Sequence, residues 1–135
     1  MCFLKAFSKT TSFKPFAQSS GMPVYSCFDK GEIRSKTKGT FYENYRISIG
    51  VSEREWDDFP GQVQDAIVFL KNWFSQIQSL SSNHQIDVLF LDFPIYSRIS
   101  DDIVNANDHL PSELIRLAGA LGLGIEMAYY NEQYL

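Results

Sequence analysis

The chain has 135 residues, of which 44% are hydrophobic and 21% charged, a composition typical of one globular domain rather than of a disordered segment. A chain of this length buries about two-thirds of its unfolded surface, so its folding requires neither a metal ion nor disulfide bonds. Its two cysteines, Cys2 and Cys27, are too few for a disulfide framework. Its longest apolar stretch is shorter than the roughly 20 residues of a membrane span, and its start lacks the apolar core of a secretory signal. We therefore expect a single domain, residues 1–135, located in the cytoplasm and without a membrane partner.

The net charge of −4 hides an uneven distribution along the chain. Residues 1–46 carry eight Lys or Arg and three Asp or Glu, which gives a net charge of +5. Residues 47–135 carry four Lys or Arg and thirteen Asp or Glu, which gives a net charge of −9. Phosphate binding needs a positive surface, so the acidic part argues against a nucleic-acid partner. It favours attraction to a basic protein.

The first half of the chain predicts two strands. Residues 1–22 have no hydrophobic period, and we expect an irregular N-terminal segment there. Residues 23–28 predict a short strand, and residues 29–32 a turn. In residues 45–51 apolar and polar side chains alternate, which predicts a half-buried strand.

Residues 60–80 predict one amphipathic helix. Apolar residues recur there at spacings of three and four: Val63, Ala66, Ile67, Leu70, Phe74 and Ile77. Asp57 and Asp58 precede this helix, where carboxylates cap backbone N–H groups and favour the positive end of the helix dipole. Pro60 suits the first turn of a helix.

The second half of the chain predicts a strand, a loop, a helix and a last strand. Residues 86–96 are almost continuously apolar, which is typical of an inner strand buried on both faces. Residues 99–109 predict an acidic loop, Ser112 a helix cap, Gly122 the end of that helix and residues 125–129 the last strand.

This order of elements predicts an α+β fold, a two-layer sandwich in which two helices pack on one face of a mostly antiparallel sheet. The inner strand presents apolar side chains to the other face as well. That face needs a cover, and we expect it from another protein chain or from the N-terminal segment. The aromatic residues of that segment are Phe3, Phe7, Phe13 and Phe16.

Few residues indicate chemistry. His84 and His109 have no partner at metal-ligand spacing and are expected to be exposed loop histidines. Asp87 and Asp92 would lie on opposite faces of a regular strand, so a joint catalytic or metal site would require a bulge. We expect no catalytic residue, no metal and no cofactor, with a small metal-dependent hydrolase as the alternative.

Two acidic clusters remain as candidate partner-binding residues. The members of the first flank Trp56, and those of the second lie in the acidic loop: Glu53, Glu55, Asp57 and Asp58, then Asp101, Asp102 and Asp108. Helix capping and a solvated loop explain these residues equally well. As a protein-binding surface, their carboxylates would meet a basic partner and Trp56 would supply a buried anchor.

The chain also resembles a group of small bacterial α+β proteins, the immunity proteins of polymorphic-toxin and contact-dependent growth-inhibition systems. The resemblance covers roughly residues 30–130 and is carried by the turns Lys30-Gly31-Glu32 and Lys38-Gly39-Thr40, the strands 45–51 and 86–93, and the ending 110–130. It implies a cognate partner, the C-terminal toxin domain of a larger effector. Many such toxins are basic nucleases, which an acidic surface could bind by imitating phosphates. A homo-oligomeric regulatory or scaffold domain is a further alternative.

Overall fold

The computed structural model describes residues 1–96, 102–131 and 133. Within these residues the chain forms seven strands: β1 (Cys2–Ser8), β2 (Val24–Phe28), β3 (Ile33–Ser35), β4 (Thr40–Phe41), β5 (Tyr45–Ser52), β6 (Val88–Tyr96) and β7 (Gly124–Tyr130). The same residues form four helices: α1 (Lys14–Ser19), α2 (Phe59–Asn72), α3 (Phe74–Ser81) and α4 (Ser112–Ala120). None of these helices is long and apolar enough to span a membrane.

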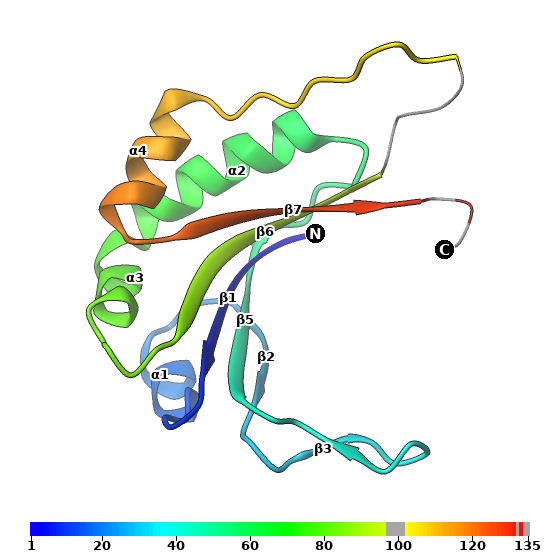
Figure 1. The fold of residues 1–135 in the computed structure, drawn as a ribbon. Helices are drawn as coiled ribbons and strands as arrows, with labels where there is room; N and C mark the ends of the chain where they lie inside the picture. The colour runs from blue at the N-terminus through cyan, green and yellow to red at the C-terminus, as the bar shows by residue number, and fades with distance from the viewer. Residues whose placement is uncertain (97–101, 132, 134–135) are drawn as a thin grey trace.

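Five strands form one mixed sheet in the order β2-β5-β1-β6-β7. The pairs β2–β5, β5–β1 and β1–β6 are antiparallel, whereas β6 and β7 are parallel and α4 connects them. Helices α2, α3 and α4 cover one face of this sheet, and the hairpin formed by β3 and β4 projects on the opposite side (Figure 1). The predicted α+β class, with helices packed on a mostly antiparallel sheet, is confirmed.

The prediction of an irregular segment at residues 1–22 is wrong, because β1 is the middle strand of the sheet. Its side chains alternate between buried and half-buried positions: Cys2, Leu4, Ala6 and Ser8 face the helices, and Phe3, Lys5 and Phe7 face the other way. The second set contains two aromatic residues, so the sequence lacks the contrast between apolar and polar positions that marks a strand. As a strand within the sheet, this segment cannot cover the sheet's face as expected, and Phe13, at the start of α1, belongs to the core.

The helix predicted for residues 60–80 is interrupted at Trp73, whose φ of −110° and ψ of 20° separate α2 from α3. The apolar positions predicted to pack on the sheet are buried, except that Phe74 is half-buried. The predicted cap at the start of the helix is confirmed. The Asp58 carboxylate accepts a hydrogen bond from the Gly61 N–H at 2.9 Å, and Pro60 lies in the first turn.

Strand β6 lies between β1 and β7, so the predicted inner strand is confirmed. Its residues Leu91, Phe93 and Ile95 are at most 2% exposed in the core. At α4 the capping residue is Pro111, and Ser112 forms no side-chain cap, so its predicted role is wrong. The predicted stop of α4 at Gly122 is confirmed, since its φ of 68° is unfavourable for residues with a side chain.

Candidate functional site

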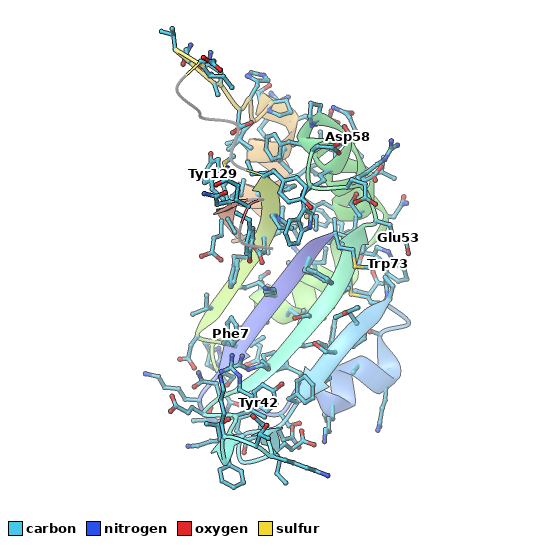
Figure 2. All side chains as sticks on the ribbon, turned by 90° about the vertical axis from the view of Figure 1, so that its right-hand side faces the viewer. Phe7, Tyr42, Glu53, Asp58, Trp73 and Tyr129 are labelled. Atoms are coloured by element: carbon cyan, nitrogen blue, oxygen red, sulfur yellow. The ribbon has the colours of Figure 1, made fainter. Side chains whose placement is uncertain are left out.

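The face of the sheet opposite α2, α3 and α4 is the candidate functional site, and we call it the open face. Among the described residues, no helix lies on it (Figure 1). Strand registers place on it a set of aromatic and charged side chains: Phe3, Lys5, Phe7, Arg46, Phe90, Asp92, Tyr96, Glu126 and Tyr130. Figure 2 looks onto this face, with Phe7 and Tyr42 close together at the end that carries the hairpin.

An ion pair occupies the centre of the open face. The Lys5 Nζ atom lies 2.7 Å from Oδ2 of Asp92, and Asp92 is 7% exposed. Oδ1 of Asp92 is buried and has no hydrogen-bond partner among the described residues. Glu126 lies beside Asp92 in the register of β6 and β7, so the centre carries two carboxylates and one ammonium group.

A ladder of rings crosses the hairpin end of the open face. The Arg46 guanidinium lies between two rings, 5.0 Å from the Phe7 centroid and 4.8 Å from the Tyr42 centroid. Phe7 stacks on Phe90 at 6.1 Å, and Tyr42 stacks on Phe28 at 4.4 Å. The ladder therefore joins strands β6, β1, β5 and β2 with the residue that follows β4. Such cation–π contacts strengthen where the cation is partly desolvated.

A second aromatic group lies at the opposite end of the open face and contains Trp56. Its ring stacks on Tyr130 with centroids 4.7 Å apart and is tilted against Tyr96 at 5.3 Å. The Tyr96 N–H donates a 3.3 Å hydrogen bond to the Trp56 carbonyl oxygen, which ties this loop to β6. Trp56 was a predicted site residue. Its two tyrosine partners were missed, because they come from strands far away in the sequence.

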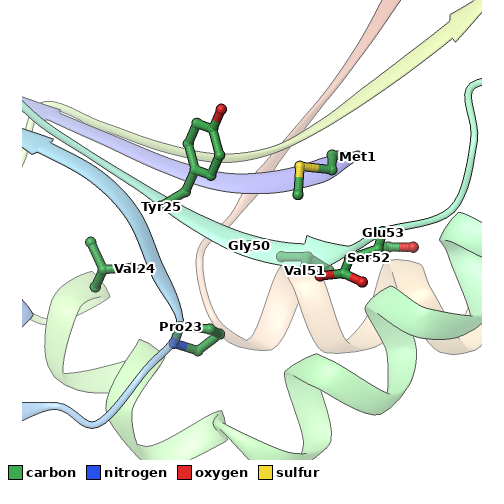
Figure 3. Close-up of a pocket in the computed structure, with 8 residues that line it drawn as sticks. All are labelled: Met1, Pro23, Val24, Tyr25, Gly50, Val51, Ser52 and Glu53. Atoms are coloured by element: carbon green, nitrogen blue, oxygen red, sulfur yellow. The ribbon is translucent and has the colours of Figure 1, made fainter.

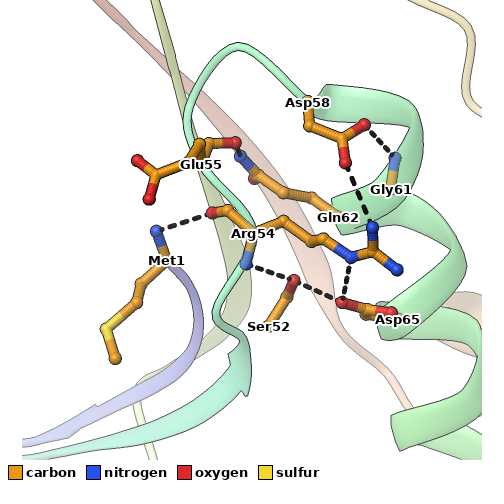
Figure 4. Close-up of polar contacts among 8 residues, drawn as sticks. All are labelled: Met1, Ser52, Arg54, Glu55, Asp58, Gly61, Gln62 and Asp65. Carbon is orange, nitrogen blue, oxygen red and sulfur yellow. Dashed lines mark hydrogen bonds and ion pairs between the residues drawn. The ribbon is translucent and has the colours of Figure 1, made fainter.

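In the acidic cluster around Trp56, Asp58 has structural contacts, which Figure 4 shows together with its neighbour Glu55. Asp58 caps α2 and lies 3.4 Å from Nη1 of Arg54, whose Nε donates to Asp65 at 3.3 Å. The structural interpretation therefore accounts for Asp58. The other three predicted residues, Glu53, Glu55 and Asp57, are exposed.

The second acidic cluster is only partly described. Asp101 lies outside the described residues, and Asp102 is exposed. Asp108 accepts a hydrogen bond from the Tyr129 hydroxyl at 3.2 Å. Asp108 also lines a depression of about 300 Å³ together with residues of the first turn of α2, among them Phe59 and Pro60. The structure thus places Asp108 beside the helix that Asp58 caps.

Another depression, of about 270 Å³, lies at the edge of the sheet near β2 and the end of β5 (Figure 3). Met1, Tyr25 and Val51 are among its apolar lining residues, and Glu53 lines it as well. The adjacent Tyr25 ring also contacts Phe3 of the open face, with centroids 5.0 Å apart. An apolar side chain of a partner could lie in this depression beside one of the predicted acidic residues.

Asp87 and Asp92, the two carboxylates considered as a joint catalytic or metal site, contact different residues. The Asp87 carboxylate accepts a hydrogen bond from the Lys9 N–H at 2.7 Å, whereas Asp92 pairs with Lys5. His84 and His109 are exposed. Within residues 1–96, 102–131 and 133, no group of three or more His, Cys, Asp or Glu could hold a metal ion. The side chains of the open face can therefore bind a partner through aromatic stacking and through ionic contacts.

No protein-family model, no curated protein and no solved structure matches this chain.

Proposed function

We propose that this chain is a binding protein without catalysis of its own, an immunity protein that neutralises the C-terminal toxin domain of a larger effector by direct contact. The observation that carries this proposal is the open face, a five-stranded sheet surface that no helix of the described residues covers, with aromatic groups at both ends and charges between them. Aromatic side chains gathered on an uncovered face of a protein mark interaction sites.

The residue types of the open face support a protein partner. Trp, Tyr, Phe and Arg are enriched in protein interfaces, and Trp, Tyr and Arg are the residues most often responsible for large binding energies there. The contacts of Trp56 with Tyr96 and Tyr130, and of Arg46 with Phe7 and Tyr42, hold these side chains in place before a partner arrives. Binding then costs less side-chain entropy than it would for mobile side chains.

The exposed carboxylates near Trp56 support a partner with a basic surface. Glu53, Glu55 and Asp57 are exposed, and in the described residues they take part in no ion pair. Residues 47–135 carry a net charge of −9, which would attract a basic toxin and accelerate its association. In this proposal the chain acts in the cytoplasm and binds neither nucleic acid nor a membrane.

Strand β7 favours a second candidate function, a homo-oligomeric scaffold. It is an edge strand of the sheet, and Tyr129 and Tyr130 at its end are exposed. An unpaired edge can accept another strand, including that of a second copy. Sedimentation of the purified chain separates the candidates, since a stable dimer at micromolar concentration supports the scaffold.

The proposed function predicts that a neighbouring reading frame encodes the toxin domain, and that domain is the partner used in the test. Co-expression should restore growth, and calorimetry with a catalytically inactive toxin domain should give a dissociation constant in the nanomolar range or below. Replacement of Trp56 by Ala should weaken binding at least 30-fold, whereas Val68→Ala, at an exposed position of α2, should leave it unchanged. If the Trp56→Ala variant still rescues growth and binds with unchanged affinity, the Trp56 end of the open face is excluded as the interface. If the unchanged chain does not bind the toxin domain at all, the proposed function is excluded.

A further inference from the structure

The hairpin end of the open face brings two arginines to one ring. The guanidinium carbon of Arg46 lies 4.8 Å from the Tyr42 centroid, and that of Arg34, on β3, lies 5.6 Å from it. The two cations are close enough to repel each other, and this repulsion, second to burial, lowers the pKa of Arg46. Positive charge is therefore concentrated at this point of a chain that is negative overall.

Neither arginine forms an ion pair among the described residues, and the attraction of Arg46 to the Glu43 carboxylate is weaker than its repulsion from Arg34. Lys5, Lys14, Arg54 and Lys71 each form an ion pair with at least one carboxylate. No ion pair and no hydrogen bond from the guanidinium is present for Arg34 or Arg46. An unpaired arginine is ordinary on a solvated surface, but Arg46 is half-buried between two rings.

The environment of Arg46 leaves its hydrogen-bonding groups unsatisfied. Its Nε is buried without an acceptor, while its terminal nitrogens are not among the buried, unpartnered atoms and so reach the surface. A guanidinium has five N–H donors, and a buried polar group without a partner loses its hydration without compensation. An anion bound at the terminal nitrogens of Arg46 would compensate the positive charge of its guanidinium group and reduce its repulsion from Arg34.

We propose that Arg34 and Arg46 form a binding site for a carboxylate group of the protein that docks on the open face. This inference rests on the proposed function and names the partner's chemistry at the hairpin end. A carboxylate matches the planar fork of a guanidinium and can bind two of its N–H groups at once. Phosphate has the same match, but Asp92 and Glu126 on this face would repel a polyanion such as nucleic acid.

The hairpin provides apolar contacts beside this site. Ile33 and Phe41 are paired across β3 and β4 and are 55% and 56% exposed. An acidic residue flanked by apolar side chains would bury these two residues while its carboxylate reaches the arginines. The partner then has an ordered charge pattern, with a carboxylate at the hairpin end and basic groups at the Trp56 end, which fixes its orientation on the sheet.

The site is tested first with glutarate, a small dicarboxylate, by following the arginine Nε–H signals in ¹⁵N-resolved NMR spectra. Glutarate should shift the Arg34 and Arg46 signals saturably and leave the Arg116 signal, from α4, unchanged. The exposed position makes Arg34→Gln the safer variant for folding, and it should weaken glutarate binding at least tenfold, as should Arg46→Gln. Arg116→Gln is the matched control and should bind like the unchanged chain.

Three results would overturn the carboxylate site: no saturable shift, equal binding in the Arg34 and Arg116 variants, or inorganic phosphate binding tenfold tighter than glutarate. Calorimetry of Arg34→Gln with the toxin domain separates this inference from the proposed function. Unchanged toxin affinity in Arg34→Gln together with loss in Trp56→Ala would reject the inference and leave the function standing. Glutarate binding in a chain that binds no toxin would reject the function, and with it the assignment of the carboxylate to a toxin.

Discussion

The Lys5 ammonium group and the Asp92 carboxylate, 2.7 Å apart, join the middle strand β1 to β6 across the open face. Their side chains are 30% and 11% exposed, so the two members of the pair differ in their access to water. Loss of Lys5 would leave a buried carboxylate uncompensated, whereas loss of Asp92 would leave an ammonium group that water still reaches. The two single replacements should therefore differ in cost.

We predict that Lys5→Met lowers the free energy of unfolding by about 3 kcal/mol, and Asp92→Leu by less than about 1 kcal/mol. The double variant should be close to the unchanged chain, because replacing both partners by apolar side chains removes the uncompensated charge. Urea denaturation of the four proteins measures this coupling. Additive costs would mean that the pair contributes nothing beyond its two separate side chains.

A second prediction concerns the start of α2. Gly61→Ala would normally stabilise a helix by about 0.5–1 kcal/mol, but a Cβ atom at this position would collide with the capping carboxylate of Asp58. The substitution should therefore be neutral or destabilising in the unchanged chain. Asp58→Ala should itself cost about 1 kcal/mol through loss of the cap.

In the Asp58→Ala background the collision is gone, so Gly61→Ala should there raise the midpoint of thermal unfolding. Circular dichroism of the two single variants and the double variant measures the effect. The same sign of the Gly61→Ala effect in both backgrounds would show that the carboxylate does not contact position 61.

The third prediction follows from Cys2, which is fully buried in β1. Burial, and after it the charge of Asp92, raises the pKa of this thiol far above its ordinary value of 9.0. Above pH 9 the unfolded thiol loses its proton while the folded thiol keeps it, so the unfolded state gains stability as the pH rises. The contribution of Cys2 is complete below pH 9 and decreases above it.

We therefore expect the unchanged chain to lose about 1.4 kcal/mol per pH unit relative to Cys2→Ala between pH 9.5 and 11. Urea denaturation of both proteins across this range measures the difference, and the other titrating groups cancel because both proteins contain them. Parallel stability curves would mean that the thiol ionises equally easily in both states.

Patterns of local sequence predicted the fold where one face of an element is apolar and the other polar. The helix positions Leu70 and Ile77 and the alternation in β5 are of this kind. Strand β1 was missed because both of its faces contain apolar residues: the small Ala6 faces the core and the large Phe7 faces the open side. The break at Trp73 was missed because no Pro or Gly marks it.

The candidate site was predictable where its residues are neighbours in sequence, as Trp56 and the carboxylates around it are. The ladder at the hairpin end was not, because it depends on strand pairing. Arg46 contacts Phe7 because the register of β5 on β1 pairs the two residues. It contacts Tyr42 because the hairpin of β3 and β4 brings the chain back to this end of β5. Local patterns do not determine either arrangement.

The fourth prediction concerns the exposed carboxylates near Trp56 and in the loop before α4. Glu55→Lys, Asp57→Lys and Asp102→Lys should chiefly slow association with a basic toxin domain, because exposed charges steer the encounter and are screened within about 10 Å at 0.1 M salt. Their effect on the association rate should therefore disappear in 1 M salt. Asn72→Lys combined with Gln78→Lys, at exposed positions of α2 and α3, changes the net charge by the same two units elsewhere and serves as the control.

Trp56→Ala should act differently, by accelerating dissociation of the toxin complex. The ring stacks on Tyr130 and leans against Tyr96, so a partner would meet a large, rigid aromatic surface whose loss costs about 2 kcal/mol or more of binding free energy. Surface plasmon resonance separates the two rates, and circular dichroism checks that the variant is folded. A slower association rate with an unchanged dissociation rate would place Trp56 at the rim rather than in the centre of the interface. Unchanged rates in Trp56→Ala and in all three charge reversals would move the interface to another part of the chain, with the hairpin end of the open face as the next region to test.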